Sequence, residues 1–238
     1  RLFEVGRVFL RNPDAQVGEL SIAGYDQPVR IAGLAYGSAN PEQWGITNRP
    51  VDFFDVKGDV EALLAPLEIK AKALSHPALH PGRSAELTIK KRGKEISLGF
   101  VGELHPRWQQ EYALPGAPVV FEIDWALIQE IGLPTIGNIS KFPAVTRDLA
   151  VVVQQSVTAA QLMDAMKSSK QPLIKKIDLF DEFKPSEGRM GGMAANEKSL
   201  AFRITLSDES GTLQDAQIEP VISALLDAMS VKCKARIR

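Results

Sequence analysis

Residues 231–238 carry the clearest chemical pattern in the sequence. Small apolar side chains alternate there with the cations Lys232, Lys234, Arg236 and Arg238. Alternate residues of a β-strand point to opposite faces, so an extended segment would place four positive charges on one face. Such a row suits the phosphates of a nucleic acid. A solvated strand face shows the same pattern without any ligand, and both interpretations are open for this segment alone.

A second alternating segment covers residues 198–207. Its apolar face carries Leu200, Phe202, Ile204 and Leu206, and its other face carries Ala201, Arg203 and Thr205. The polar face with Arg203 is a candidate ligand surface, although half-buried sheets alternate in the same way without a ligand. Residues 199–203 lack the aromatic pattern with which RNA-recognition-motif strands stack bases, which disfavours that type of domain.

Other residue types with chemical potential do not converge on a catalytic or metal site. His76 and His80 are each followed by proline, which prevents a helical pair of ligands, and His105 is the third and last histidine. The single cysteine, Cys233, falls on the apolar side of the predicted last strand, as an inert buried thiol does. We find no P-loop, Gly-x-Ser-x-Gly or Gly-x-Gly-x-x-Gly motif. We therefore predict no catalytic residue, no metal site and no cofactor in this chain.

Composition limits the class of protein. The 238 residues hold 28 Lys and Arg against 29 Asp and Glu, so nucleic-acid binding must be local rather than driven by net charge. One cysteine fits a reducing compartment, and no apolar run is long enough to span a membrane. We expect a soluble, cytoplasmic protein. The chain opens directly into a strand-like segment without an initiator Met, so we expect it to be a piece of a longer protein.

Two domains are predicted. Residues 132–138 combine Gly, Pro and Asn without periodicity, which indicates a connector and divides the chain into residues 1–139 and 140–238. The second part holds 14 Lys and Arg against 12 Asp and Glu, a net charge of +2, whereas the first part is net −3. The second part is therefore the better candidate for contact with a polyanion.

Periodicity predicts an α+β fold for both parts. In the first, a helix over residues 55–67 accompanies strands over residues 2–9, 30–36, 85–90, 96–104 and 119–124, with a hairpin turn at residues 91–94. This pattern is typical of an antiparallel sheet with interspersed helices. In the second, strands over residues 147–153, 174–183, 198–207 and 231–238 alternate with a helix capped by Thr158 and a helix over residues 212–229. The order βαββαβ is that of a ferredoxin-like domain.

Several motifs resemble the β subunit of bacterial phenylalanyl-tRNA synthetase. In the second part they are residues 141–153, 179–181, 198–202 and 212–215; in the first they are residues 1–6, 52–61, 80–85 and 99–106. Their order and spacing together are specific, whereas each alone is weak. The resemblance implies a catalytically inactive class II synthetase-like module with an antiparallel sheet, followed by a ferredoxin-fold anticodon-binding domain. The chain would then be a C-terminal fragment of that subunit.

The resemblance also implies which residues bind RNA. Phe183 takes the position of an aromatic that stacks on the first anticodon base, which suits any base because each has a π-face. Asp181 would accept hydrogen bonds from the edge of a guanine base, and Ser199 would form a hydrogen bond with the same base. The small side chain of Ala150 would allow the bases to approach the backbone closely. The cations Arg203, Lys234 and Arg236 are the predicted phosphate contacts. An alternative for Phe183 is a core aromatic at a strand end.

The expected partners follow from the same family. They are tRNA-Phe and the catalytic α subunit of an αβ heterotetramer, with ATP and Mg²⁺ needed by the complete ligase of protein biosynthesis but not held by this fragment. The sequence departs from the family pattern at Gly211, where arginine is usual, at Phe183, where tyrosine is commoner, and in the long loop of residues 185–196. The alternative from another class is an amino-acid regulatory module, because ferredoxin-like domains also serve as sensors. The loop of residues 154–157 lacks the glycine expected of such a sensor.

Overall fold

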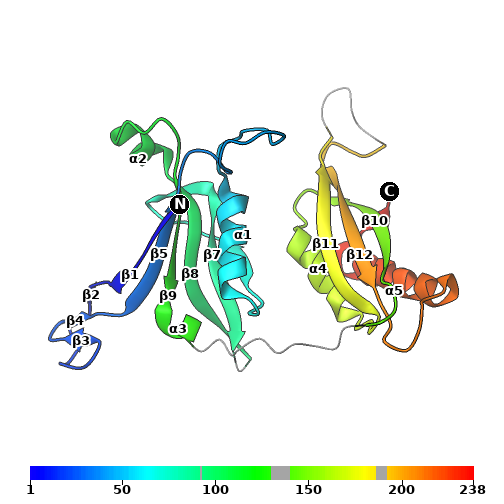
Figure 1. The fold of residues 1–238 in the computed structure, drawn as a ribbon, viewed down its shortest axis with the longest axis horizontal. Helices are drawn as coiled ribbons and strands as arrows, with labels where there is room; N and C mark the ends of the chain where they lie inside the picture. Colours follow the sequence, from blue (N-terminus) through cyan, green and yellow to red (C-terminus); the bar gives the residue numbers. More distant parts are fainter. Residues whose placement is uncertain (92, 130–139, 186–191) are drawn as a thin grey trace. The chain divides into compact units, whose positions relative to one another are not determined.

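The computed structural model describes residues 1–91, 93–129, 140–185 and 192–238. The chain divides into two compact units, residues 1–135 and 136–238 (Figure 1). The predicted connector at residues 132–138 and the predicted boundary after residue 139 lie outside the described residues, as do Arg92 of the predicted hairpin turn and most of the predicted loop of residues 185–196.

The first unit contains a six-stranded antiparallel sheet in the order β1-β5-β9-β8-β7-β6 and a small three-stranded sheet in the order β2-β4-β3. Its elements are β1 (Leu2–Arg7), β2 (Leu10–Arg11), β3 (Ser21–Ile22), β4 (Tyr25–Asp26), β5 (Val29–Ala35), α1 (Phe53–Leu64), β6 (Lys70–Ala73), β7 (Leu79–Lys91), β8 (Lys94–Leu104), α2 (Pro106–Glu111), β9 (Val119–Asp124) and α3 (Trp125–Gln129).

The predicted elements of the first unit are present with shifted ends. The predicted helix ends at Leu64 rather than at residue 67, because Pro66 disfavours a helical conformation of the residue before it. Strand β6 is absent from the sequence prediction because its four residues are all exposed and its two apolar residues are only alanines. β7 and β8 form the predicted hairpin, with Lys91 opposite Lys94.

The core of the first unit lies between α1 and one face of the large sheet. Val56, Val60 and Leu64 of α1 pack with buried residues of β5, β7, β8 and β9. β8 and β9 approach so closely that a Cβ on Gly99 would lie 1.9 Å from the carbonyl oxygen of Glu122, and the φ of Gly99 is +142°. Only glycine fits this position, so the strand pairing depends on it.

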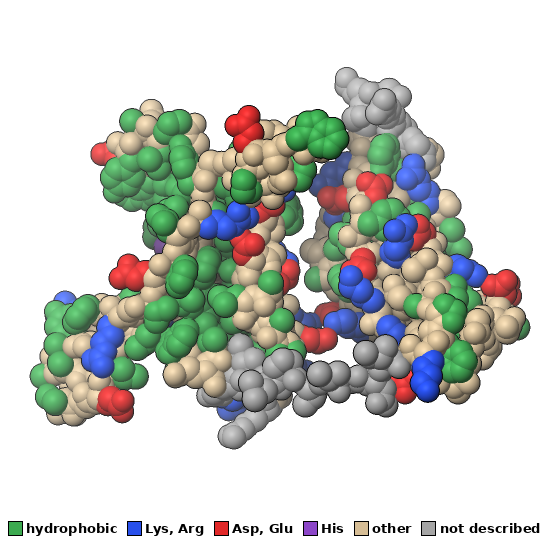
Figure 2. All heavy atoms as spheres, viewed as in Figure 1, with side chains coloured by type: hydrophobic (Ala, Val, Ile, Leu, Met, Phe, Trp, Pro, Cys, Tyr) green, Lys and Arg blue, Asp and Glu red, His purple; other side chains and the backbone are tan. Residues whose placement is uncertain are grey.

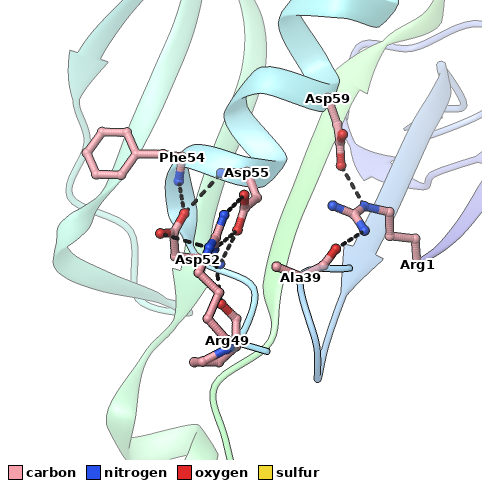
Figure 3. A network of polar contacts seen from close by, with 8 residues as sticks. Arg1, Ala39, Arg49, Asp52, Phe54, Asp55 and Asp59 are labelled. Atoms are coloured by element: carbon pink, nitrogen blue, oxygen red, sulfur yellow. Dashed lines mark hydrogen bonds and ion pairs between the residues drawn. The ribbon is translucent and has the colours of Figure 1, made fainter. Parts of the chain in front are cut away.

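A polar network fixes the start of α1 (Figure 3). Asp52 is the N-cap, and its carboxylate accepts hydrogen bonds from the backbone N–H groups of Phe54 and Asp55. The Asp55 carboxylate in turn accepts a hydrogen bond from the backbone N–H of Asp52. Arg49 donates to both oxygens of Asp55 at 2.7 Å. This bond from Arg49 is the main cause that lowers the pKa of Asp55 to about 2.

The second unit is a four-stranded antiparallel sheet in the order β11-β12-β10-β13 with two helices (Figure 1). Its elements are β10 (Val145–Gln154), α4 (Ala159–Ser168), β11 (Ile174–Phe183), β12 (Glu197–Leu206), α5 (Asp215–Cys233) and β13 (Arg236–Ile237). The chain order βαββαβ with this strand order is the predicted ferredoxin-like arrangement. Thr158 caps α4 as predicted.

The core of the second unit lies between the two helices and one face of this sheet. Leu200, Phe202, Ile204 and Leu206 are each no more than 1% exposed, which confirms the predicted apolar face of β12. They pack with residues of α4, α5 and β10, among them Leu162, Leu225 and Val151. The two helices also contact each other.

The predicted strand over residues 231–238 is wrong. α5 runs on to Cys233, because its buried stripe continues through Leu225 and Met229 toward the half-buried Cys233 at helical spacing. Lys234 follows in the left-handed conformation and ends the helix, and its N–H donates to the carbonyls of Met229 and Ser230. Only Arg236 and Ile237 form strand β13. The four cations therefore do not share one strand face.

Candidate nucleic-acid interface

The sheet face opposite α4 and α5 is the candidate interface. We call it the open face, because no helix of the described part of the second unit covers it. Its residues alternate with the core residues of each strand. They are Asp148, Ala150 and Val152 of β10, Glu197, Ser199, Ala201 and Arg203 of β12, Asp178, Asp181 and Phe183 of β11, and Arg236 of β13.

The structure brings most of the predicted RNA-binding residues together on this face. Phe183 lies opposite Ser199, and Asp181 lies opposite Ala201. Ala201 in turn pairs with Ala150. Four predicted residues thus surround one small area at which two alanines leave space above the sheet.

The exposure of these residues differs. Asp181 is exposed and Phe183 is half-buried. Ser199 is only 2% exposed and Val152, beside it on β10, only 1%, although both lie on the open face. This end of the open face is therefore covered, whereas Asp181 lies at its accessible part.

Two predicted cations on the open face are already paired with carboxylates. Arg203 donates to both oxygens of Asp148 at 2.7 and 2.8 Å, and Arg236 donates to Glu197 at 2.8 Å. The bond from Arg203 is the main cause that lowers the pKa of Asp148. For Glu197 the main cause of the lowered pKa is the backbone N–H of Ala194, followed by Arg236. Basic and acidic side chains are accordingly interspersed on the visible surface of the second unit (Figure 2).

Lys234 does not belong to the open face. It is the left-handed residue that ends α5 rather than a strand residue, so its predicted place in a row of phosphate contacts is not supported by the backbone. Cys233 likewise is the last residue of a helix, not a strand residue; its thiol is half-buried, and burial raises its pKa.

Two features of the open face are missing from the predicted set. The guanidinium of Arg238 lies 5.1 Å from the centre of the Phe183 ring, and the N–H of Arg238 donates to the carbonyl of Ala150. The ring of Phe180, 52% exposed, lies 5.1 Å from the guanidinium of Arg203. Alternation from Asp178 and Leu179 places Phe180 on the open face, and the register shift between Leu179 and Asp181 then keeps Asp181 on the same face.

The described residues of the first unit offer no comparable chemical site. The Nδ1 atoms of His76, His80 and His105 each accept a backbone N–H two residues ahead, so the three histidines stabilise turns and a helix start. Among the residues described, we find no group of three potential metal ligands, and no helix is long and apolar enough to cross a membrane.

Several charged side chains of the first unit are held in pairs. One pocket of the first unit is lined by Arg49 and Glu103, which pair with Asp55 and Arg83. Arg1 donates to Asp59 and to the carbonyl of Ala39 (Figure 3). These arginines thus stabilise the fold.

Large hydrophobic side chains are exposed on the first unit (Figure 2). Leu2 and Phe3 of the edge strand β1 are 74% and 77% exposed, Phe9 is 66% exposed and Trp44 is fully exposed. Where such exposed apolar side chains are contiguous, as Leu2 and Phe3 are in the sequence, they are typical of a surface that contacts another protein.

Comparisons with known proteins give consistent matches for both units. Residues 1–125 match the family model of the phenylalanyl tRNA synthetase beta chain CLM domain, and residues 140–238 match that of the ferredoxin-fold anticodon binding domain. The chain is 51%, 50% and 49% identical to proteins named phenylalanine–tRNA ligase beta subunit from Cupriavidus pinatubonensis, Burkholderia lata and Ralstonia nicotianae. Each alignment covers 100% of this chain and 29% of the relative, so the chain spans less than a third of the relatives' length.

Proposed function

The chain belongs to the family of phenylalanyl-tRNA synthetase beta chains, and from this membership we propose that it binds the anticodon region of tRNA-Phe through the open face of its second unit. The alternative of an amino-acid regulatory module receives no support from the matched families. The observation that carries the proposal is the convergence of Phe183, Asp181, Ser199 and Ala150 on one area of the open face.

The residue types in this area suit a purine base. An aromatic ring supplies a stacking surface for any base, and a carboxylate accepts hydrogen bonds from the N–H groups that guanine presents on its Watson–Crick edge. The small side chains of Ala150 and Ala201 leave the sheet surface open between them. Asp181 is exposed and faces the same side as Phe183, so a base stacked on the ring would have its edge within reach of the carboxylate.

We further propose that the first unit is a class II synthetase-like module without a catalytic site, and that it contacts the α subunit of the complete ligase. The exposed apolar side chains of β1 and of Phe9 and Trp44 support a role in assembly. A phosphate-binding role needs an arginine that is free to reach a ligand, whereas Arg1 and Arg49 are held by Asp59 and Asp55. ATP and Mg²⁺ would then be bound by the catalytic partner, in the cytoplasm.

Binding of two RNAs tests the proposed function. The chain should bind the anticodon stem-loop of tRNA-Phe more tightly than a stem-loop of equal length in which the anticodon bases are exchanged. Asp181→Asn should reduce the ratio between the affinities for the two stem-loops more than it lowers the affinity for the tRNA-Phe stem-loop. The reason is that contacts to base edges determine specificity. Phe180→Ala, which removes the other aromatic of the open face, is the matched control for Phe183→Ala. Equal affinity for both RNAs would contradict the proposal.

A further inference from the structure

A pocket of the first unit is lined by polar side chains from two segments of the chain. Ser75 and His76 belong to the segment before β7, and His105 and Arg107 belong to the start of α2, at the end of β8 (Figure 1). Two prolines and a leucine form the apolar part of the wall. The pocket has a volume of about 400 Å³, which is within the usual range for small ligands.

Contacts between and around the two segments fix the walls of this pocket. The backbone N–H of His105 donates to the carbonyl of Ala78 at 2.9 Å, and the indole N–H of Trp108 donates to the carbonyl of Pro77 at 3.2 Å. The His76 ring stacks on the ring of Phe100, with 5.2 Å between the ring centres. Both segments and the His76 ring are therefore held in defined positions.

Both imidazole rings of the pocket present a hydrogen-bond donor. Nδ1 of His76 accepts the N–H of Ala78 at 3.2 Å, and Nδ1 of His105 accepts the N–H of Arg107 at 3.0 Å. A neutral imidazole carries one proton, so in both rings this proton lies on Nε2, on the ring edge away from that backbone. A protonated Nε2 cannot bind a metal ion, but its N–H can donate to an anion.

Arg107 adds a positive charge to these donors. Its guanidinium lies 4.3 Å from the centre of the Trp108 ring and forms no ion pair within the described part of the chain, unlike those of Arg49 and Arg83. None of the described residues that line the pocket is acidic. The pocket thus combines a guanidinium, two imidazole N–H groups and the Ser75 hydroxyl, a set that suits an anion.

We infer that this pocket binds a phosphate group. The oxygens of a phosphate accept hydrogen bonds from several directions, which fits donors that come from two separate segments, and guanidinium groups match phosphate geometry well. Phosphates of two kinds share this chemistry, those of an RNA backbone and those of small molecules. The inference concerns the first unit and does not depend on the anticodon binding proposed for the second.

Nuclear magnetic resonance of the ¹⁵N-labelled 238-residue chain tests the inference. The ¹⁵N shifts of the three histidine rings report which ring nitrogen carries the proton. Inorganic phosphate, titrated at constant ionic strength, should shift the ring signals of His76 and His105 in a saturable way and leave that of His80 unchanged. His80 is the internal control, because its Nδ1 also accepts backbone N–H groups while its side chain does not line the pocket.

Asparagine substitutions separate the Nε2–H donor from the bond that Nδ1 makes to the backbone. The asparagine side-chain oxygen can replace Nδ1 as an acceptor, so His76→Asn and His105→Asn should melt close to wild type. Both variants lose a donor to a charged ligand, so we expect roughly tenfold weaker phosphate binding, against an unchanged affinity of His80→Asn. Arg107→Gln should also weaken binding about tenfold, whereas Arg11→Gln, which removes an exposed charge outside the pocket, should not.

Titrations with pyrophosphate and with tRNA-Phe identify the source of the phosphate. Shifts of the His76 and His105 signals by pyrophosphate alone indicate a small molecule, and shifts by tRNA-Phe that pyrophosphate reverses indicate a backbone phosphate; both results support the inference. It is overturned if inorganic phosphate moves neither signal, if the His80 signal moves equally, or if the ¹⁵N shifts place the protons on Nδ1. Equal losses of affinity in Arg107→Gln and Arg11→Gln would show diffuse attraction instead of a site and would overturn it too.

Discussion

Replacement of Phe183 by alanine separates a binding role from a core role of this side chain. Phe183 is half-buried at the end of β11, on the open face, and is not part of the cluster that forms the core of the second unit. Phe202, on the neighbouring strand, is fully buried in that cluster. The two phenylalanines therefore form an internal comparison between an aromatic of the open face and an aromatic of the core.

The expected magnitudes differ accordingly. A buried Phe→Ala change costs about 3–5 kcal/mol, which we expect for Phe202→Ala. Phe183→Ala removes a half-buried ring and its surface contact with Arg238, so we expect a loss of about 1–2 kcal/mol. One base–aromatic stack contributes about 1–3 kcal/mol, which corresponds to about 5- to 150-fold weaker RNA binding by Phe183→Ala. Phe183→Tyr keeps the π-face and should change neither property much.

Thermal unfolding and RNA titration of the same preparations provide the assay. The Phe183→Ala protein should melt close to wild type, remain folded at the titration temperature and bind the tRNA-Phe anticodon stem-loop more weakly. The reasoning is refuted if Phe183→Ala is destabilised as strongly as Phe202→Ala while its folded fraction binds RNA with wild-type affinity. Phe183 would then be a core aromatic.

Three further substitutions test other parts of the structure. The pKa of Asp55 is about 2 in the fold against an ordinary 3.8, so its pair with Arg49 stabilises the first unit above pH 3.8, and this stabilisation is lost as the pH falls toward 2. Because Arg49 is half exposed, we expect Asp55→Asn to cost about 1 kcal/mol of stability at neutral pH. A difference in melting temperature between wild type and Asp55→Asn that does not shrink between pH 4 and 2 would contradict this. Asp148→Asn should release Arg203 and steepen the salt dependence of RNA binding by about one contact, and an unchanged salt dependence would show that Arg203 does not reach phosphate. Lys234→Gly should stabilise the second unit by about 0.5 kcal/mol, because glycine adopts the left-handed conformation without strain, while a loss of stability would contradict the assignment of Lys234 as the helix end.

Local patterns in the sequence were sufficient to predict most of the second unit. The bounds of β11 were predicted without error, and Thr158 was correctly identified as a helix cap, because a side-chain acceptor before an apolar period has a direct physical effect on the backbone. The apolar face of β12 followed from strict alternation. These are features that neighbouring residues determine among themselves.

Features that depend on tertiary packing were not predictable in the same way. Residues 231–233 alternate in charge as a strand would, yet the core of the second unit extends α5 through Cys233. The register shift beside Phe180 has no marker in the sequence, since no glycine or proline accompanies it. The contact between Arg238 and Phe183 joins residues 55 positions apart across two intervening strands, so it is visible only once the strand order is known.

Site-specific cross-linking tests the central claim that the open face of the second unit receives the anticodon. The anticodon stem-loop of tRNA-Phe would carry 6-thioguanosine in place of the first anticodon base, be irradiated in complex with the chain, and the attached peptide be identified by mass spectrometry. We expect attachment to the end of β11 that contains Asp181 and Phe183 or to the segment of Arg236 and Arg238, and a reduced yield with Phe183→Ala. Attachment to the helix side of the second unit or to the first unit, with a yield unaffected by Phe183→Ala, would contradict the claim.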